Sequence, residues 1–263
     1  WEKTTRPFLR SREFLWQEGH TVHATSEEAK EETLKMLNIY ADFCEEVLAI
    51  PVIKGEKTEK ERFAGAEATY TIEALMYNGV ALQSGTSHYF GDGFARAFNM
   101  KFMDKDNTEK YMFQTSWGMT TRIIGAMIMT HSDDHGLVLP PNIAPIKVSI
   151  IPIGKNNTEV LDKSYEIAKS LKLAGITCEV DDSEKSPGFR FAEAEMRGIP
   201  VRIEFGPKDL ENDLCVLVRR DTLEKVHVTL DSVVEEVIKL LLEIQNSMYI
   251  RAKIRRDEMT KSV

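Results

Sequence analysis

The chain has 263 residues, 42% of them hydrophobic, and a formal net charge of −8 at pH 7. This length can hold two domains of ordinary size, and the composition is that of a globular protein. The acidic balance argues against a DNA partner, although a local basic face can still bind RNA. No apolar run reaches the length of a membrane span, so no membrane partner is expected. Cys44, Cys178 and Cys215 form no C-x-x-C pair, which indicates reduced thiols in a cytoplasmic protein, with no protein zinc site.

The first half of the chain predicts antiparallel strands and a helix. Residues 6–24 predict a strand, because side chains of similar character recur at every second position. Ser26 is the expected cap of a helix with apolar positions up to Leu48. Asn78-Gly79 predicts a hairpin over 68–87 with a type I′ turn. The other expected elements are strands at 51–53, 97–103 and 111–115, and a helix at 122–130.

The second half has a different character. Pro140, Pro141 and Pro145 form a rigid connection, where we place a domain boundary. Strands and helices then alternate, which predicts a small α/β domain with a largely parallel or mixed sheet. The expected strands are 147–153, 177–180, 201–205, 215–219 and 225–229, with helices at 160–173 and 189–197 and a long one from Ser232.

Residues 10–20 are the most informative stretch. They combine two arginines, two carboxylates, two aromatic rings and an imidazole, and a strand would place Phe14, Trp16, Glu18 and His20 on one face. Such a face suits a polar, planar ligand better than a core, and guanidinium groups suit phosphate. The alternative is an exposed strand with ion pairs.

Four segments carry a family resemblance. The run RPFLRSREFLWQEGH at 6–20 resembles motif 2 of the prolyl-tRNA synthetases, which are class II aminoacyl-tRNA synthetases. The runs QSGTSHY at 83–89 and QTSWGMTTR at 114–122 resemble that family's Q-x-x-T-S-H-Y strand and its motif 3. Residues 195–209, with R-G-I-P and G-P-K-D elements, resemble the anticodon-binding domain of class IIa synthetases. Too few residues separate motifs 2 and 3 for an inserted editing domain, as in the eukaryote/archaeal-like type.

The resemblance implies an α/β (α+β) fold. We expect an antiparallel-sheet class II catalytic domain at 1–143, a small α/β anticodon-binding domain at 144–240, and a helix at 241–263 leading to a missing carboxy-terminal domain. Motif 1 and the motif 2 arginine that precedes the position of Trp1 are absent from the sequence. The chain is therefore interpreted as a fragment that is inactive by itself.

The resemblance also implies a function and its partners. The parent protein would form prolyl-adenylate from proline and ATP, and then transfer proline to the 3′ end of tRNA(Pro). ATP would bring Mg²⁺ with it, and a homodimer is expected. The alternatives are another class IIa synthetase, or a non-catalytic synthetase-like regulator that binds tRNA or proline. Phosphate- and adenine-directed residues argue against the regulator.

The resemblance assigns site residues as well. Arg10 and Arg122 would be catalytic and contact the γ-phosphate. The ATP-binding set would be Glu2, Arg10, Phe14, Gln83, Thr86 and Arg122. The proline-binding set would be Phe63, Trp16, Glu18, His20, His88, Ser116 and Gly118. The anticodon-binding set would be Glu195, Arg202 and Lys208, with Arg202 and Lys208 in a sheet-edge setting. A basic face toward the RNA stem would include Arg219, Arg220 and Lys225.

Structural explanations compete with several of these assignments. Without the motif, Trp16 and Phe63 would be read as core residues, since large aromatic side chains are often buried. Ser87 beside His88 suggests a nucleophile and a base, but strand alternation places them on opposite faces. His131 and His135 have metal-like spacing, although their position after the predicted helix favours a polar turn.

Overall fold

The computed structural model describes residues 3–154 and 157–260, which form two compact units. Among the described residues, the first unit comprises 3–46, 50–130 and 255–260, and the second comprises 47–49, 131–154 and 157–254. Within the described ranges, no helix is both long and apolar enough to cross a membrane.

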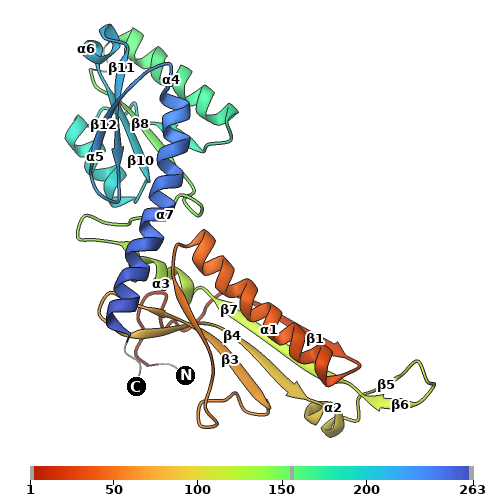
Figure 1. Cartoon of the computed structure of the whole chain (residues 1–263). Helices are drawn as coiled ribbons and strands as arrows, with labels where there is room; N and C mark the ends of the chain where they lie inside the picture. Colours follow the sequence, from red (N-terminus) through yellow and green to blue (C-terminus); the bar gives the residue numbers. More distant parts are fainter. Residues whose placement is uncertain (1–2, 155–156, 261–263) are drawn as a thin grey trace. The chain divides into compact units, whose positions relative to one another are not determined.

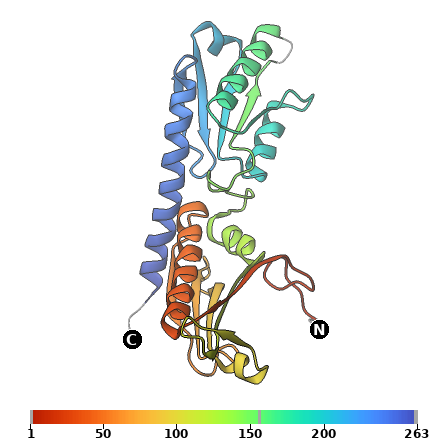
Figure 2. The ribbon, with the colours of Figure 1, turned by 90° about the vertical axis from the view of Figure 1, so that its right-hand side faces the viewer.

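The first unit is built on a five-stranded antiparallel sheet in the order β1-β7-β4-β3-β2. A helix, α1 (Ser26–Asp42), contacts all five strands and lies along one face of the sheet, as Figure 1 and Figure 2 both show. A π-helical turn at Phe43–Val47 continues it. The strands are β1 (Trp16–His23), β2 (Val52–Glu56), β3 (Ala68–Leu75), β4 (Ala81–Gly91) and β7 (Phe113–Thr120). The smaller elements are α2 (Gly93–Ala97), β5 (Lys101–Met103), β6 (Glu109–Tyr111) and α3 (Arg122–His131).

Strand alternation leaves one face of this sheet for α1 and the other for a site. The hydroxyl of Ser87 donates a hydrogen bond to the Thr33 carbonyl of α1 at 2.8 Å. Its neighbour His88 therefore points to the opposite face. The prediction that Ser87 and His88 lie on opposite faces is confirmed, and a nucleophile–base pair between them is excluded.

The predicted strand over 6–24 is wrong in its first part. Only Trp16–His23 pairs with a neighbouring strand, β7. Residues 6–10 form a tight turn instead, with main-chain hydrogen bonds in both directions between Arg6 and Arg10 at 2.8 and 3.0 Å. Pro7 inside this turn has no N–H to donate to a strand ladder.

Three local predictions in this unit need correction. The helix cap is Thr25, whose hydroxyl accepts from the Glu28 N–H, while Ser26 bonds to Tyr89. The hairpin is present, but only Gly79 of the Asn78-Gly79 pair has a positive φ, and a type I′ turn needs two such residues. The strand expected from Ala97 begins at Lys101, because the short helix α2 occupies the preceding residues.

The second unit has a five-stranded mixed sheet in the order β12-β11-β10-β8-β9, which confirms the predicted α/β domain. Its strands are β8 (Val148–Pro152), β9 (Cys178–Val180), β10 (Val201–Phe205), β11 (Leu214–Arg219) and β12 (Lys225–Thr229). Its helices are α4 (Thr158–Leu173), α5 (Pro187–Met196), α6 (Pro207–Glu211) and α7 (Val233–Met259), of which α6 was not predicted. The residues of α7 from Arg255 onward belong to the first unit.

The two faces of this sheet pack against different helices. Ile150 and Ile203 belong to the large core cluster that also contains side chains of α4 and α7. Ile151 packs instead with Ala194 of α5. Because side chains alternate along a strand, Arg202 of β10 faces the α5 side. A buried polar network therefore forms between β10 and α5.

Candidate functional site

A cavity of about 580 Å³ opens on the sheet face of the first unit that carries His88. Strands β1, β4 and β7, the turn at residues 6–10 and the loop after β2 all contribute to its wall. Of the predicted ATP and proline residues, the cavity is lined by Arg10, Phe14, Trp16, Glu18, Phe63, Gln83, Thr86, His88, Ser116, Gly118 and Arg122.

Among the described residues, His20 is the one predicted ATP or proline residue that does not line this wall. Glu2 lies outside the described residues. His20 lines a separate hollow with Phe90 and Phe94, although its Nε2 lies 3.3 Å from Glu18 Oε1. His20 is therefore next to the cavity, in contact with the Glu18 carboxylate and opposite Ser116 in the pairing of β1 with β7.

The aromatic side chains of the cavity are exposed. Trp16 is 61% exposed, Phe63 54% and Phe14 51%, so the core interpretation of Trp16 and Phe63 is wrong. Phe14 and Trp16 meet edge to face at 5.4 Å between ring centroids, and Phe63 lies 4.8 Å from the His88 ring. Large rings that the fold leaves uncovered offer apolar and stacking surface to a ligand.

His88 is held as a neutral imidazole. Its Nδ1 lies 3.0 Å from the Thr69 hydroxyl on the adjacent strand β3. Burial, and then the positive charge of Lys57, lower the pKa of His88 to about 4, and the opposing influence of Glu18 is smaller. At neutral pH the imidazole therefore does not repel a cationic ligand.

The two arginines reach the cavity from opposite ends of the first unit's sequence. Arg122 begins α3, and its Nε donates to the Leu9 carbonyl at 3.2 Å. This bond attaches the turn that contains Arg10 to the start of the helix. Two guanidinium groups, each a fork of planar donors suited to phosphate, are brought to one wall in this way.

Gly118 and Gly19 differ in what the protein itself requires. A Cβ at Gly19 would lie 2.3 Å from the indole ring of Trp117, so packing demands glycine there. A Cβ at Gly118 would meet only the Gln17 carbonyl, at 3.8 Å. Packing does not explain glycine at 118, whereas space for a ligand in the cavity does.

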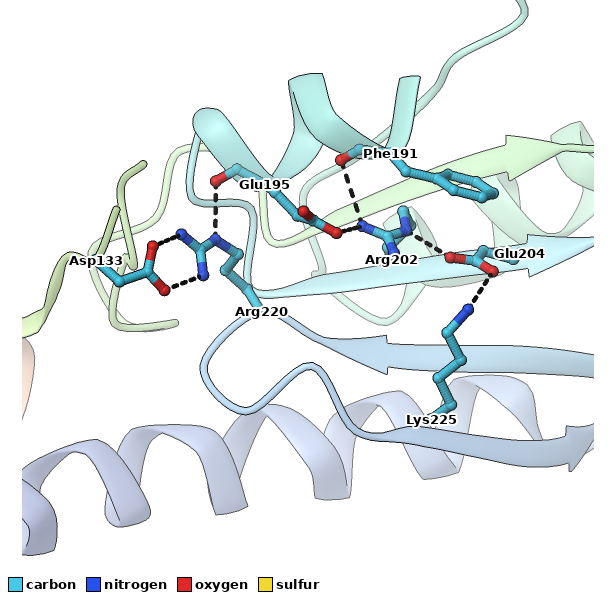
Figure 3. A network of polar contacts seen from close by, with 7 residues as sticks. All are labelled: Asp133, Phe191, Glu195, Arg202, Glu204, Arg220 and Lys225. Carbon is cyan, nitrogen blue, oxygen red and sulfur yellow. Dashed lines mark hydrogen bonds and ion pairs between the residues drawn. The ribbon is translucent and has the colours of Figure 1, made fainter. Parts of the chain in front are cut away.

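The second unit holds the predicted anticodon residues Glu195 and Arg202 in a compact polar network, shown in Figure 3. Arg202 Nε donates to Glu204 Oε1 at 2.7 Å, and its Nη1 donates to Glu195 Oε1 at 2.9 Å. The Arg202 side chain is only 8% exposed, and its guanidinium lies 4.6 Å from the Phe191 ring centroid. Strand β10 is the central strand of its sheet, so the expected sheet-edge setting of Arg202 is wrong.

Arg219 and Arg220 are also held internally. Arg220 binds both Asp133 oxygens, at 2.8 and 2.6 Å, and donates its Nε to the Glu195 carbonyl at 2.8 Å. Arg219 binds both oxygens of Asp221 at 2.9 Å. The expectation that these two arginines extend an open basic face is therefore wrong, because each guanidinium already has a carboxylate partner.

Two predicted polar residues at the surface have simpler settings. Lys208 is exposed on α6. Lys225 is about half exposed, and its Nζ lies 3.3 Å from Glu204 Oε2.

The segment with metal-like spacing forms a turn. His131 Nε2 lies 2.9 Å from the Leu48 carbonyl, and Asp133 pairs with Arg220. Main-chain bonds between Asp133 and Gly136 close the turn. Within the described part of the chain, no group of three or more His, Cys, Asp or Glu side chains is arranged to hold a metal ion.

Each of the two units matches a family of known proteins. Residues 1–131 match the family model of the tRNA synthetase class II core domain (G, H, P, S and T), and residues 147–240 match that of the anticodon binding domain. A proline–tRNA ligase of Lachnospira eligens is 64% identical over 260 residues, which are 99% of this chain and 54% of the relative. A proline–tRNA ligase of Clostridium novyi is 60% identical over 261 residues, 99% of this chain and 54% of the relative.

A third relative, proline–tRNA ligase 2 of Bacillus thuringiensis subsp. konkukian, is 57% identical over 264 residues, which are 100% of this chain and 55% of the relative. This chain belongs to the prolyl-tRNA synthetase family. It spans about half the length of the curated relatives it matches. The predicted fold, a class II synthetase core followed by an anticodon-binding domain, is confirmed. Class II synthetases use ATP, generally with Mg²⁺.

Two charged residues of the cavity were not predicted from the sequence. Lys57 and Glu61 both line it, from the segment that follows β2. In the sequence they belong to a run of alternating charges, which is typical of a solvated loop. Only the register of β2 against β3 brings Lys57 to the wall, so the sequence held no specific signal for it.

Proposed function

We propose that the protein containing this chain attaches proline to tRNA(Pro). ATP and proline would first form prolyl-adenylate, and proline would then pass to the 3′ end of the tRNA. The observation that carries this proposal is a single cavity in which two arginines meet an aromatic pocket with a carboxylate. One part of such a cavity suits a nucleoside triphosphate, and the other suits a small amino acid with a cationic ammonium group and an apolar ring.

On the nucleotide side, Arg10 and Arg122 would bind the triphosphate. Their charges would compensate the phosphate oxygens, which carry the negative charge during transfer at the α-phosphorus. The exposed Phe14 ring offers a surface on which adenine can stack. Gln83 and Thr86 would contact phosphate or ribose. Mg²⁺ would arrive with ATP and be held mainly by phosphate oxygens.

On the amino-acid side, Trp16 and Phe63 would enclose the proline ring. Glu18 would pair with the secondary ammonium group, and the neutral His88 ring would contribute apolar surface without a repelling charge. Ser116 would add a hydroxyl to this wall. The open space over Gly118 leaves room for the substrate. His20 would act through Glu18, since it does not line the cavity itself.

In the second unit, Glu195, Arg202 and Lys208 would read the anticodon. Lys208 is exposed and suits direct contact with a base edge or a phosphate. Arg202 already bonds to two carboxylates, so it would contact a guanine only by rearranging that network or through donors that the carboxylates leave over. The family resemblance further suggests a cytoplasmic homodimer.

Amino-acid-dependent ATP–pyrophosphate exchange tests the proposal on the full-length protein, across all twenty amino acids. We expect strong exchange with proline alone. Exchange with a different amino acid would keep the synthetase fold and overturn the specificity. If none of the twenty amino acids supported exchange, the result would favour a non-catalytic protein that binds tRNA or proline.

A further inference from the structure

Lys57 is placed at the cavity by the strand pairing of the first unit. Its main-chain N–H donates to the Thr69 carbonyl at 2.8 Å, one step beyond the last register pair of β2 and β3. Thr69 in turn stands opposite His88 on β4. Lys57, Thr69 and His88 therefore lie side by side across neighbouring strands, and both Lys57 and His88 line the cavity.

The ammonium group of Lys57 fixes the orientation of a second cavity residue. Its Nζ donates a hydrogen bond to Gln83 Oε1. An ammonium has only donors, so it can meet only the oxygen of the amide. The NH₂ group of Gln83 consequently points away from Lys57. Together the two side chains offer further N–H donors and no additional strong acceptor, which suits an anion.

Lys57 also lies between the two halves of the proposed substrate site. Its charge acts on His88, where it contributes after burial to the lowered pKa, and its ammonium bonds to Gln83. His88 belongs to the proposed proline side and Gln83 to the nucleotide side. The place where these sides meet is where an amino-acid carboxylate must approach the α-phosphate of ATP.

We propose that Lys57 contacts this junction and reduces the repulsion between the amino-acid carboxylate and the α-phosphate. The inference rests on the proposed function. In the reaction, a carboxylate oxygen of proline attacks the α-phosphorus and forms the new O–P bond. The bond to the bridging oxygen breaks, and pyrophosphate leaves with that electron pair. Lys57 neither gains nor loses a proton, and its contribution is electrostatic.

Substitution of Lys57 in the full-length protein tests the inference. Lys57→Met removes the charge but keeps an unbranched chain, and we expect kcat/KM for proline-dependent exchange to fall about 100-fold, mainly through kcat. Lys57→Arg keeps a cation and should retain much of the activity. Lys54→Met is the matched control, because Lys54 lies on β2 but is exposed and bonds to Asn38 Oδ1 at 2.8 Å. It should match the wild type.

A second measurement separates an electrostatic role from a folding defect. The pKa of His88, followed by NMR, should rise in Lys57→Met, whereas the affinity for tRNA should stay unchanged. Wild-type exchange with proline together with full activity of Lys57→Met would overturn the inference about Lys57 and leave the proposed function standing. An equal fall in Lys54→Met would also overturn it. Failure of the wild type to exchange with any amino acid would overturn both.

Discussion

Two arginines of the first unit and two of the second unit have opposite settings. In the first unit, Arg10 and Arg122 line an open cavity beside exposed aromatic rings. In the second unit, Arg202 and Arg220 have side chains that are 8% and 2% exposed, each bound to carboxylates of the same unit. The first arrangement presents guanidinium groups to a ligand in the cavity, whereas the second holds them in buried ion pairs within the fold.

This difference separates residues that a ligand needs from residues that the fold needs. A buried guanidinium must be paired, because an unpaired buried charge is costly. A residue at an open cavity has water as an alternative partner, so its removal should affect ligand binding far more than stability. Substitutions in the two units should therefore change different measured quantities.

Arg122→Ala should have the largest effect on activity. We expect proline-dependent pyrophosphate exchange in the full-length protein to fall about 10³-fold, because a charge that compensates the triphosphate is lost. The unfolding midpoint in urea should change little. Arg96→Ala is the control, since Arg96 is exposed and pairs with Asp92 away from the cavity. Unchanged exchange in Arg122→Ala would contradict the role proposed for this arginine.

Arg220→Met should affect stability rather than chemistry. It removes two bonds to Asp133 and one to the Glu195 carbonyl, and we expect a loss of about 3 kcal/mol in the free energy of unfolding. Arg197→Met removes a similar two-bond pair with Glu179, but that pair is partly exposed and should cost less than about 1 kcal/mol. Equal losses in the two variants would show that burial of the network is unimportant.

The stability of the first unit should depend on pH through the protonation of His88. Its pKa in the folded state is about 4, against 6.5 as the reference, so the unfolded state binds more protons between these values. Stability should therefore fall as the pH falls from about 6.5 to about 4, by roughly 3 kcal/mol at most. Urea unfolding across this range measures the slope. His88→Asn should remove this part of the slope, and an identical slope in the variant would contradict the buried, neutral imidazole.

The sequence predicted the elements of both units better than the setting of their polar residues. The family resemblance supplied nearly all of the predicted cavity residues, and strand alternation by itself predicted only that Trp16 and Glu18 of β1 share the face of the cavity. Arg202 was misplaced, because the sequence does not reveal which strand is central. Lys57 was missed, because its position depends on the register between β2 and β3.

Two glycines on neighbouring strands of the first unit, Gly118 and Gly19, also separate a residue that the ligand needs from one that the fold needs. Gly118→Ala should fold normally, since the new methyl group would lie no closer than 3.8 Å to another protein atom. It should raise KM for proline about tenfold, because the methyl group enters the substrate space. Gly19→Ala should instead lower stability through the clash with Trp117. Normal proline kinetics in Gly118→Ala would show that the substrate does not pass over this residue.

Substitution of Lys208 should have the smallest effect. Within the second unit, the exposed setting of Lys208 resembles that of the arginines that line the cavity of the first unit. It is exposed on α6, whereas Arg202 is enclosed. Lys208→Ala should therefore leave the free energy of unfolding unchanged and raise KM for tRNA about fivefold to tenfold, corresponding to roughly 1 kcal/mol for one contact. Proline-dependent exchange should stay at the wild-type level. Arg202→Met is the informative partner, because it should lower stability by more than Lys208→Ala does. If Lys208→Ala reduced exchange and tRNA charging equally, Lys208 would have a structural role, and the division between ligand-directed and fold-directed cations would not hold in the second unit.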